Sequence, residues 1–265
     1  MSEPTAHGSH GGCAHHHHHL PFGGGLLSRD EQRRAARQLS LAMLALGLLL
    51  LGLAWRWLAA DQGCVGICWS NTAPNMPAWG GRDCRIGNNP LIMAVPRSNG
   101  EHVVIDCAIS QFSYGKMEDC RLRGTRLPVP GGYNEQGELT RDPAEIEKTG
   151  RVLPMGYWKG SGLSIVLDLI ATVLTNGNAV HTVGTFEAEA GLTQVMVAID
   201  PAGFGTGADT DAIVDGILAN VKQSEPAEEG GEVCYPGERS LRSMRENREL
   251  GIPVIDEIWE SVLNM

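Results

Sequence analysis

An uncharged, leucine-rich run at residues 39–55 constrains this chain more than any other feature, because so much apolar surface has to be buried. A membrane-spanning helix usually needs about 20 apolar residues, with about 17 as the lower limit. The run just reaches that limit before Arg56 ends it. Arginines at positions 29, 33, 34 and 37 precede it and would keep the N-terminus cytoplasmic if the run crossed a membrane. Two interpretations stay open: a membrane anchor, or a helix that packs on the rest of the protein.

Residues 1–25 are rich in histidine and glycine and include a histidine run from His15 to His19. Such a composition builds no packed core, so we expect a disordered tail. A capping-box pattern follows, with Ser28 as the N-cap and Glu31 three residues later, and it predicts the start of a helix. The expected organisation is a tail at residues 1–25, a leucine-rich helix at residues 26–58 and a folded domain at residues 59–265.

The folded domain combines short β-rich runs with amphipathic helical patterns. Strands are expected at residues 65–69, 91–95, 102–108 and 193–199, and helices at residues 163–174, 213–221, 240–250 and 256–263. Gly177 is the expected stop of the first of these helices, Asp209 and Asp211 open the second, and Gly251 closes the third. The pattern predicts a domain that mixes helices and strands.

Charge and motifs exclude several classes of function. A net charge of −10 argues against nucleic acid as the partner, because binding to phosphates needs clustered cations. The seven cysteines lack metal-site spacing, which favours reduced thiols in a cytosolic protein and predicts no metal site. No Walker-type motif is present, and the glycines at 203, 205 and 207 miss the spacing of a dinucleotide fingerprint, so a structural loop is expected there.

The segment Leu153-Pro154-Met155-Gly156-Tyr157-Trp158-Lys159-Gly160-Ser161-Gly162 leads directly into the first expected helix of the domain. It places a glycine-rich turn, aromatic rings and a lysine at a helix start. Backbone N–H groups and the helix dipole favour negative charge at such a place. The segment therefore suits an anionic ligand that carries a ring. Taken by themselves, Trp158 and Lys159 would be a core aromatic and a solvated surface charge.

Several further segments, in one order along the chain, carry a resemblance to a known family. They are Gly66-Ile67-Cys68-Trp69-Ser70-Asn71, Pro77-Ala78-Trp79-Gly80, Cys84-Arg85-Ile86-Gly87-Asn88-Asn89-Pro90-Leu91-Ile92, Gln111-Phe112-Ser113-Tyr114-Gly115, Leu127-Pro128-Val129, Tyr235-Pro236-Gly237-Glu238-Arg239 and Glu246-Asn247-Arg248. From about residue 57 to the C-terminus, the chain resembles the malate/L-lactate dehydrogenase family, most closely the members that reduce 2,3-diketo-L-gulonate.

The resemblance implies an α+β fold with a mixed sheet and flanking helices, in which the nicotinamide-binding domain is not a Rossmann fold. It implies a cytoplasmic homodimer that reversibly transfers a hydride between NADH, with NADPH as the alternative, and a small 2-oxo acid resembling 2,3-diketo-L-gulonate. The cofactor contacts carried over from the family are His102, Val103, Val104, Ile105, Asp106, Cys107, Ala108, Trp158, Lys159, Gly237, Glu238 and Arg239. Within this set, Asp106 can accept from a ribose hydroxyl, Trp158 offers a flat face to a ring, and Lys159 and Arg239 can meet phosphate charge.

The N-terminal part departs from the family. Ketone reduction needs a proton donor, which the family supplies from a histidine in a Ser-His-Gly segment. Ser9-His10-Gly11 repeats the three letters without the matching flanks, so His10 is the candidate acid by its letters alone. Three hypotheses follow: a reductase of 2-oxo sugar acids, a truncated or rearranged product that keeps the cofactor domain without the catalytic histidine, and a membrane-tethered binding module.

Overall fold

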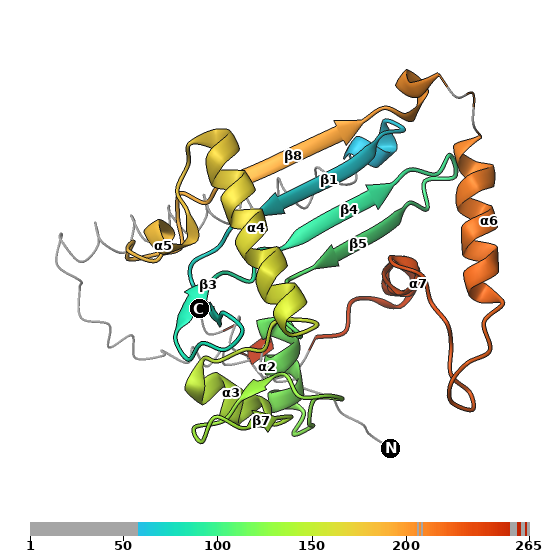
Figure 1. Cartoon of the computed structure of the whole chain (residues 1–265). Helices are drawn as coiled ribbons and strands as arrows, with labels where there is room; N and C mark the ends of the chain where they lie inside the picture. Colours follow the sequence, from blue (N-terminus) through green and yellow to red (C-terminus); the bar gives the residue numbers. More distant parts are fainter. Residues whose placement is uncertain (1–57, 206, 208, 255–258, 261–262, 264–265) are drawn as a thin grey trace, which may run out of the picture. The chain divides into compact units, whose positions relative to one another are not determined.

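The computed structural model describes residues 58–205, 207, 209–254, 259–260 and 263 (Figure 1). These residues belong to a unit that extends from Ser40 to Met265. The expected tail at residues 1–25, the leucine-rich run, His10 and most of the expected helix at residues 256–263 lie outside the described residues.

A four-stranded sheet forms the centre of the described part. Its strand order is β5-β4-β1-β8 (Figure 1). The strands are β1 (Val65–Ser70), β4 (Leu91–Val95), β5 (Val103–Cys107) and β8 (Gln194–Ile199). Each predicted strand is confirmed to within one residue at either end. The order places β1 beside β8, two strands separated by more than a hundred residues of chain.

All three pairings of this sheet are antiparallel, so the expectation of a mixed sheet is wrong for the described residues. Residues 96–102 join β4 to β5, and a parallel connection needs a crossover of about a dozen residues or more. An antiparallel sheet with helices outside it is an α+β arrangement, and it differs from the parallel sheet of a Rossmann fold.

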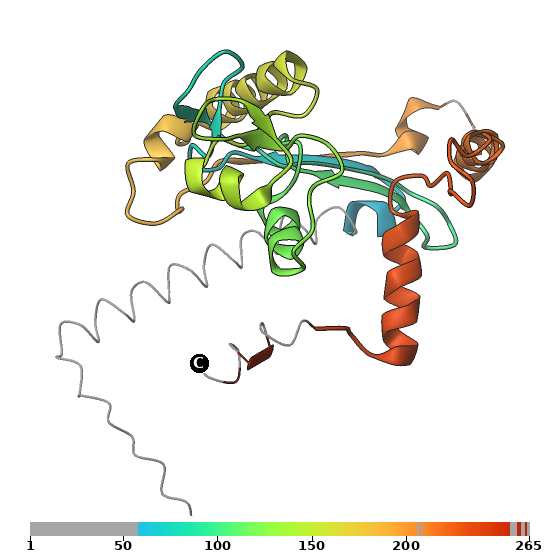
Figure 2. The ribbon, with the colours of Figure 1, turned by 90° about the horizontal axis from the view of Figure 1, so that it is seen from below.

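The two faces of the sheet carry different partners, because side chains alternate between the faces along each strand. On one face, Ala94 and Val104 pack against Ala60 of a short helix at residues 58–61. On the other face, the indole nitrogen of Trp69 donates to the carbonyl of Leu167 at 3.0 Å, which holds helix α4 (Trp158–Thr175) on the sheet. Figure 2 shows the sheet nearly edge-on, with α4 on the opposite side from residues 58–61.

Three of the four predicted helices are confirmed, although α4 begins five residues before its predicted start. Asp209 caps α6 (Thr210–Lys222) by accepting from Ala212 N, and Gly251 caps α7 (Glu238–Leu250). α4 ends at Thr175, and its C-cap is Asn176, whose φ of 52° places it in the left-handed region, so the turn comes one residue before the expected Gly177. Asparagine tolerates this region better than most residues, which explains the shift by one position.

A smaller layer was not predicted. It contains α2 (Tyr114–Leu122), α3 (Pro143–Thr149), β6 (Gly132–Tyr133) and β7 (Leu139–Thr140). Its core consists of Met117, Cys120, Leu127, Ile146 and Val152. The remaining short elements are β2 (Met76–Pro77), β3 (Cys84–Ile86), α5 (Val180–Val183) and the 3₁₀ turn η1 (Pro201–Phe204). These elements are too short for a sequence period to show. His181 lies in α5.

A buried polar network fixes α4 to the loops around the sheet. The amide of Asn71 donates to Asp168 Oδ1 at 2.9 Å, and its oxygen accepts from Thr193 N at 2.8 Å. The amide of Asn89 donates to the carbonyl of Ser164 at 2.9 Å. Both asparagines are fully buried. Because buried polar groups are costly when unpaired, this network sets the position of α4 and of the turn before it.

Candidate functional site

The start of α7 lies directly against β5. Val104 N–H donates to the carbonyl of Pro236 at 3.3 Å. Gly237, the N-cap of α7, has a φ of 92°, and a Cβ at this position would lie 3.1 Å from Val104 N and 3.3 Å from Val104 O. A glycine is therefore required both by the backbone conformation and by the close approach. Two of the segments predicted to hold the cofactor, more than a hundred residues apart in sequence, are thus in contact.

A pocket of about 550 Å³ opens at this contact. It is lined by Val104, Ile105, Asp106, Pro236, Gly237, Ser240, Leu241 and Met244. Hydrocarbon side chains form most of its wall, while Asp106 and Ser240 add a carboxylate and a hydroxyl. This volume and lining are typical of small-molecule sites. The lining suits a ligand that has a flat apolar part and hydroxyl groups.

The start of α4 carries the third predicted segment. Gly156 and Tyr157 have φ values of 61° and 60°, and Tyr157 is one of two described non-glycine residues in the left-handed region. A Cβ on Gly160 would overlap the carbonyl oxygen of Met155. Strained backbone of this kind costs about 1–3 kcal/mol per residue and clusters at functional sites. The turn places the rings of Tyr157 and Trp158 at the surface.

Three aromatic rings gather at this turn. The ring centroids of Trp79 and Tyr157 are 5.3 Å apart, and those of Tyr157 and Trp158 are 6.4 Å apart and stacked. Trp79 N donates to Ser161 Oγ at 2.9 Å, which ties the β2–β3 loop to the first turn of α4. All three rings are well exposed, and Trp158 reaches 61%. Trp79 and Tyr157 were not predicted as site residues, although both lie in segments that carry the family resemblance.

The end of β5 and the start of α4 are joined through the backbone. Met155 N donates to Ile109 O at 2.9 Å, and Gln111 N donates to Leu153 O at 2.7 Å. Ile109 follows β5 by two residues, and Met155 precedes Trp158 by three. These bonds attach the turn that carries Trp158 to the segment that follows β5, the strand that lines the pocket. Trp158 and Lys159 are not among the residues that line the pocket.

Both ring nitrogens of His102 have partners inside the protein. Its ring is buried, Nδ1 accepts from Arg97 N at 3.0 Å, and Nε2 lies 2.9 Å from Asp61 Oδ1. Because Nδ1 accepts from a backbone N–H, Nε2 carries the proton and donates to the carboxylate. The backbone carbonyl of His102 is turned towards Gly237, at 3.5 Å from the position of an added Cβ. The ring joins residues 58–61 to the β4–β5 turn, so a cofactor would meet the backbone of His102 rather than its ring.

The surroundings of Cys107 in β5 do not favour a reactive thiolate. The six cysteines of the described part form no disulfide. Burial, with a smaller effect from the Asp106 carboxylate, raises the pKa of the Cys107 thiol. A raised pKa disfavours the thiolate, which is the nucleophilic form.

Charged side chains surround the first turn of α7. Lys222 Nζ donates to Glu238 Oε1 at 2.8 Å, and Glu238 Oε2 accepts from Tyr235 N at 3.2 Å. Arg242 forms a two-pronged bond to Glu232, with distances of 2.6 and 2.9 Å. These bonds tie α7 to α6 and to the loop before α7. Arg239 is exposed on the neighbouring surface of α7, beside Ser243 and Asn247.

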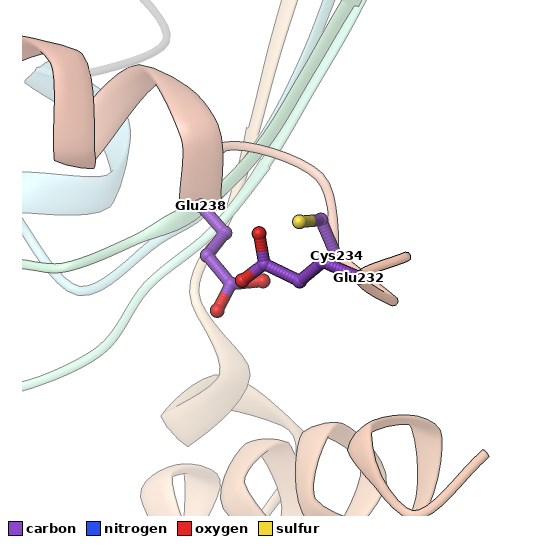
Figure 3. Close-up of side chains that lie close together, drawn as sticks. All are labelled: Glu232, Cys234 and Glu238. Carbon is purple, nitrogen blue, oxygen red and sulfur yellow. The ribbon is translucent and has the colours of Figure 1, made fainter. Parts of the chain in front are cut away.

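Glu232, Cys234 and Glu238 converge so closely that their ligand atoms lie within 4.8 Å of one another (Figure 3). Metal ions favour such a set, but Arg242 and Lys222 already bond the two carboxylates. A cation would have to displace these bonds. The cluster is therefore an ion-pair network that positions the start of α7.

This network predicts an acid-sensitive contact. Hydrogen bonding from Arg242 lowers the pKa of Glu232 from 4.5 to about 2. The folded pKa is depressed, so the contribution to stability is present above pH 4.5 and is lost as the pH falls towards 2. We expect Glu232→Gln to destabilise the protein at neutral pH and to weaken the dependence of stability on pH below 4.5. Urea unfolding at pH 6 and pH 3.5, roughly, measures this difference.

The control for this prediction is Glu249→Gln, at an exposed position near the other end of α7. It should keep the acid dependence of the unmodified protein. Equal acid dependence in Glu232→Gln and the unmodified protein would contradict the role given to the Glu232–Arg242 pair.

Comparisons with known proteins show which family the chain matches and which proteins are similar to it. The sequence profile of the malate/L-lactate dehydrogenase family matches residues 48–263. A 2,3-diketo-L-gulonate reductase from Klebsiella pneumoniae (strain 342) is 45% identical over 212 residues, which cover 80% of this chain and 63% of the relative. The reductase of the same description from Citrobacter koseri is 46% identical over the same shares. The chain thus spans less than two thirds of the length of these relatives.

Solved structures show the same fold. A putative malate/lactate dehydrogenase from E. coli superposes with a TM-score of 0.71 at 25% identity, covering 80% of this chain and 60% of that chain. A delta1-piperideine-2-carboxylate reductase from Pseudomonas syringae pvar. tomato gives a TM-score of 0.63 at 26% identity, covering 78% and 61%. In both cases, more than a third of the other chain has no counterpart in the superposed part of this one.

Proposed function

This chain belongs to the malate/L-lactate dehydrogenase family, and from that premise we propose that it is an oxidoreductase that reduces a 2-oxo sugar acid resembling 2,3-diketo-L-gulonate with NADH. The observation that carries the proposal is the pocket between β5 and the start of α7, where two cofactor segments implied by the family resemblance meet. We further propose that residues 59–265 form the cofactor domain, that the protein is cytoplasmic and that it acts as a homodimer.

The residues at the pocket fit such a cofactor chemically. Asp106 can accept hydrogen bonds from ribose hydroxyls, and the hydrocarbon wall suits a flat base. Lys159 and Arg239, both exposed, can approach the phosphates. The exposed ring of Trp158, stacked on Tyr157, can pack against the second ring of the cofactor. When bound, the nicotinamide supplies the hydride, and the protein orients it towards the ketone.

The proton that completes ketone reduction has to come from another group. Outside residues 1–25 the chain has two histidines, His102 and His181. Both ring nitrogens of His102 are engaged by Arg97 and Asp61. His181 is exposed on α5, which packs beside β3. These environments favour a second proposal, in which the domain binds the cofactor but turns over slowly for lack of an acid, unless His10 supplies it.

Titration of the purified chain with NADH, followed by addition of 2,3-diketo-L-gulonate, tests both proposals. NADH fluorescence should change on binding. Oxidation at about 1 per second or faster would support the reductase. Binding without oxidation would support the cofactor-binding form without turnover. If NADH does not bind at all, both proposals fail.

The charge of Asp106 leads to a prediction about whether the protein binds NADH or NADPH more tightly. Its carboxylate would repel the additional phosphate of NADPH, so we expect the unmodified protein to prefer NADH. Asp106→Ser should lower the affinity for NADH and raise that for NADPH, each by about tenfold. Fluorescence titrations with the two nucleotides measure the change. Asp83→Ser, on an exposed loop, is the control, and unchanged preference in Asp106→Ser would refute the assignment.

A further inference from the structure

Arg151 is a partly buried arginine whose side chain has no acceptor in the described part of the chain. Among the arginines of that part, Arg97 and Arg151 are partly buried and the others are exposed. Arg97 donates to Asp215 Oδ1 at 2.6 Å and to the carbonyl of Glu101 at 3.3 Å. The Nε atom of Arg151 is enclosed without a hydrogen-bond partner, and no described carboxylate pairs with its guanidinium. Because a buried donor without a partner is costly, this side chain points to an acceptor from outside the chain.

The guanidinium of Arg151 is held in place without the use of its donors. Arg151 N donates to Thr149 Oγ1 at 3.2 Å, and Arg151 O accepts from Tyr133 N at 2.9 Å, so the backbone is fixed between α3 and β6. The guanidinium carbon lies 5.1 Å from the centre of the Tyr133 ring, and a terminal nitrogen lies 3.6 Å from the position of a Cβ added to Gly137. A guanidinium held over a ring keeps its fork of N–H groups for another acceptor.

The acidic side chains of the β6–β7 hairpin have other partners. Glu135 Oε2 accepts from Lys148 Nζ at 2.8 Å, and Glu138 Oε2 accepts from Asn134 Nδ2 at 3.3 Å. Neither carboxylate forms an ion pair with Arg151, although both belong to the hairpin beside it. The positive charge of Arg151 is therefore not neutralised by its own hairpin and remains available to an anion.

Tyr133 connects Arg151 to the turn that carries Tyr157 and Trp158, which we call the aromatic turn. Burial raises the pKa of the Tyr133 hydroxyl, the charge of Arg151 opposes this shift, and the nearby Tyr157 adds to it. The Tyr133 hydroxyl makes no hydrogen bond within the described residues. Arg151 precedes Met155, where the turn begins, by four residues, which span about 14 Å at most. An unused guanidinium and an unused hydroxyl thus lie together near the aromatic turn.

We propose that Arg151 and Tyr133 bind the carboxylate of the 2-oxo acid, an inference that rests on the proposed function and adds the site of its substrate. A carboxylate can accept two parallel bonds from a guanidinium and a further bond from a hydroxyl. In a 2-oxo acid the ketone carbon is bonded directly to the carboxylate carbon, so a group that holds the carboxylate also positions the ketone. The aromatic turn, against which the second ring of the cofactor is proposed to pack, lies next to this site.

A phosphate of the cofactor is the other oxyanion that a guanidinium can bind. The segments proposed to hold the cofactor already provide Lys159 and Arg239 for the phosphates, and both are exposed. Arg151 lies outside these segments, beside β6 in the smaller layer. This position favours the carboxylate of the oxo acid over a phosphate.

Titration calorimetry of the full chain with 2,3-diketo-L-gulonate tests the proposal. Saturating NAD⁺ replaces NADH, because the oxidised cofactor has no hydride to transfer and binding is then measured without turnover. Arg151→Met should weaken binding of the acid by about tenfold to a hundredfold, because charge-assisted bonds are lost. Arg126→Met is the matched control: Arg126 is exposed, its loss removes the same charge, and the affinity for the acid should not change.

The amide of the same acid separates recognition of the carboxylate from a change of fold. It has nearly the same shape and no charge, so it should lose much less affinity in Arg151→Met than the acid does. Unchanged affinity for the acid in Arg151→Met, or equal losses for acid and amide, would overturn the proposal. A variant that loses affinity for NADH but keeps it for the acid would also overturn it, because Arg151 would then hold a cofactor phosphate.

The same titration without nucleotide keeps this proposal apart from the proposed function. If the unmodified chain does not bind NADH, the proposed function fails. Loss of acid binding in Arg151→Met, but not in Arg126→Met, would still support the carboxylate site. If the unmodified chain does not bind the acid with or without nucleotide, the carboxylate site is wrong.

Discussion

Gly237→Ala should weaken NADH binding by about tenfold or more and destabilise the protein by about 1–3 kcal/mol. The residue has a φ of 92°, where an L side chain is strained. The added Cβ would lie 3.1 Å from Val104 N, 3.3 Å from Val104 O and 3.5 Å from His102 O. All three neighbours are backbone atoms, two in β5 and one in the residue before it. Backbone atoms cannot change rotamer to make room as a side chain can. The start of α7 would have to move away from β5, and the pocket would lose its shape.

Gly216→Ala is the matched control for this substitution. Gly216 lies within α6, and an added Cβ there would have no neighbour within 4 Å. Alanine is the better helix former by about 1 kcal/mol, so this variant should be as stable as the unmodified protein or more so. Fluorescence titration with NADH and urea unfolding of both variants make the comparison. If Gly237→Ala bound NADH as tightly as Gly216→Ala, the pocket between β5 and α7 would not be the cofactor site.

Asn71→Ala should destabilise the protein by about 3 kcal/mol or more, because each buried group left unpaired costs about 1–3 kcal/mol. The side chain is fully buried and bonds Asp168 Oδ1, Asn178 O and Thr193 N at 2.9, 2.6 and 2.8 Å. Removing it leaves the Asp168 carboxylate and the Thr193 N–H without these bonds. Since Asp168 belongs to α4, we also expect the aromatic turn at its start to become less well positioned.

Urea unfolding, followed by circular dichroism, measures the loss, and the shift of the fluorescence of the aromatic turn reports on its position. Asn220→Ala is the control, because Asn220 is exposed on α6 and the change should stay within about 0.5 kcal/mol. A loss of less than about 1 kcal/mol in Asn71→Ala would show that the polar network does not hold α4 in place.

The strands and long helices were predictable because each carries a period of its own. β4 was predicted with both ends correct, and Asp209 and Gly251 were recognised as caps. Each of these signals lies within a few neighbouring residues, so the local sequence is sufficient. α2 and α3 were missed because their nine and seven residues are mostly polar, and their burial depends on a core assembled from distant segments.

The candidate site was predictable only as separate segments. The family resemblance pointed to residues 102–108, Trp158, Lys159 and residues 237–239, but gave no distances between them. The structure brings Gly237 onto Val104 and directs the His102 ring towards Asp61. Trp79 was missed as a site residue, because only the folded chain places it 5.3 Å from Tyr157. The segment Pro77-Ala78-Trp79-Gly80 was the one signal that could have suggested it.

By itself, the sequence determined the four strands of the main sheet, the three longest helices of the described part, the family and the chemical character of the residues at the site. These depend on patterns that are local or that recur in order along the chain. Only the tertiary structure decided that the sheet is antiparallel, that β5 and α7 enclose a pocket, and that α4 turns its aliphatic residues outward. An apolar helical period is the same whether its apolar side faces a core or the surface. The direction in which the apolar side points is set by the bonds on the opposite side of the helix, and here Asn71 and Asn89 hold that opposite side.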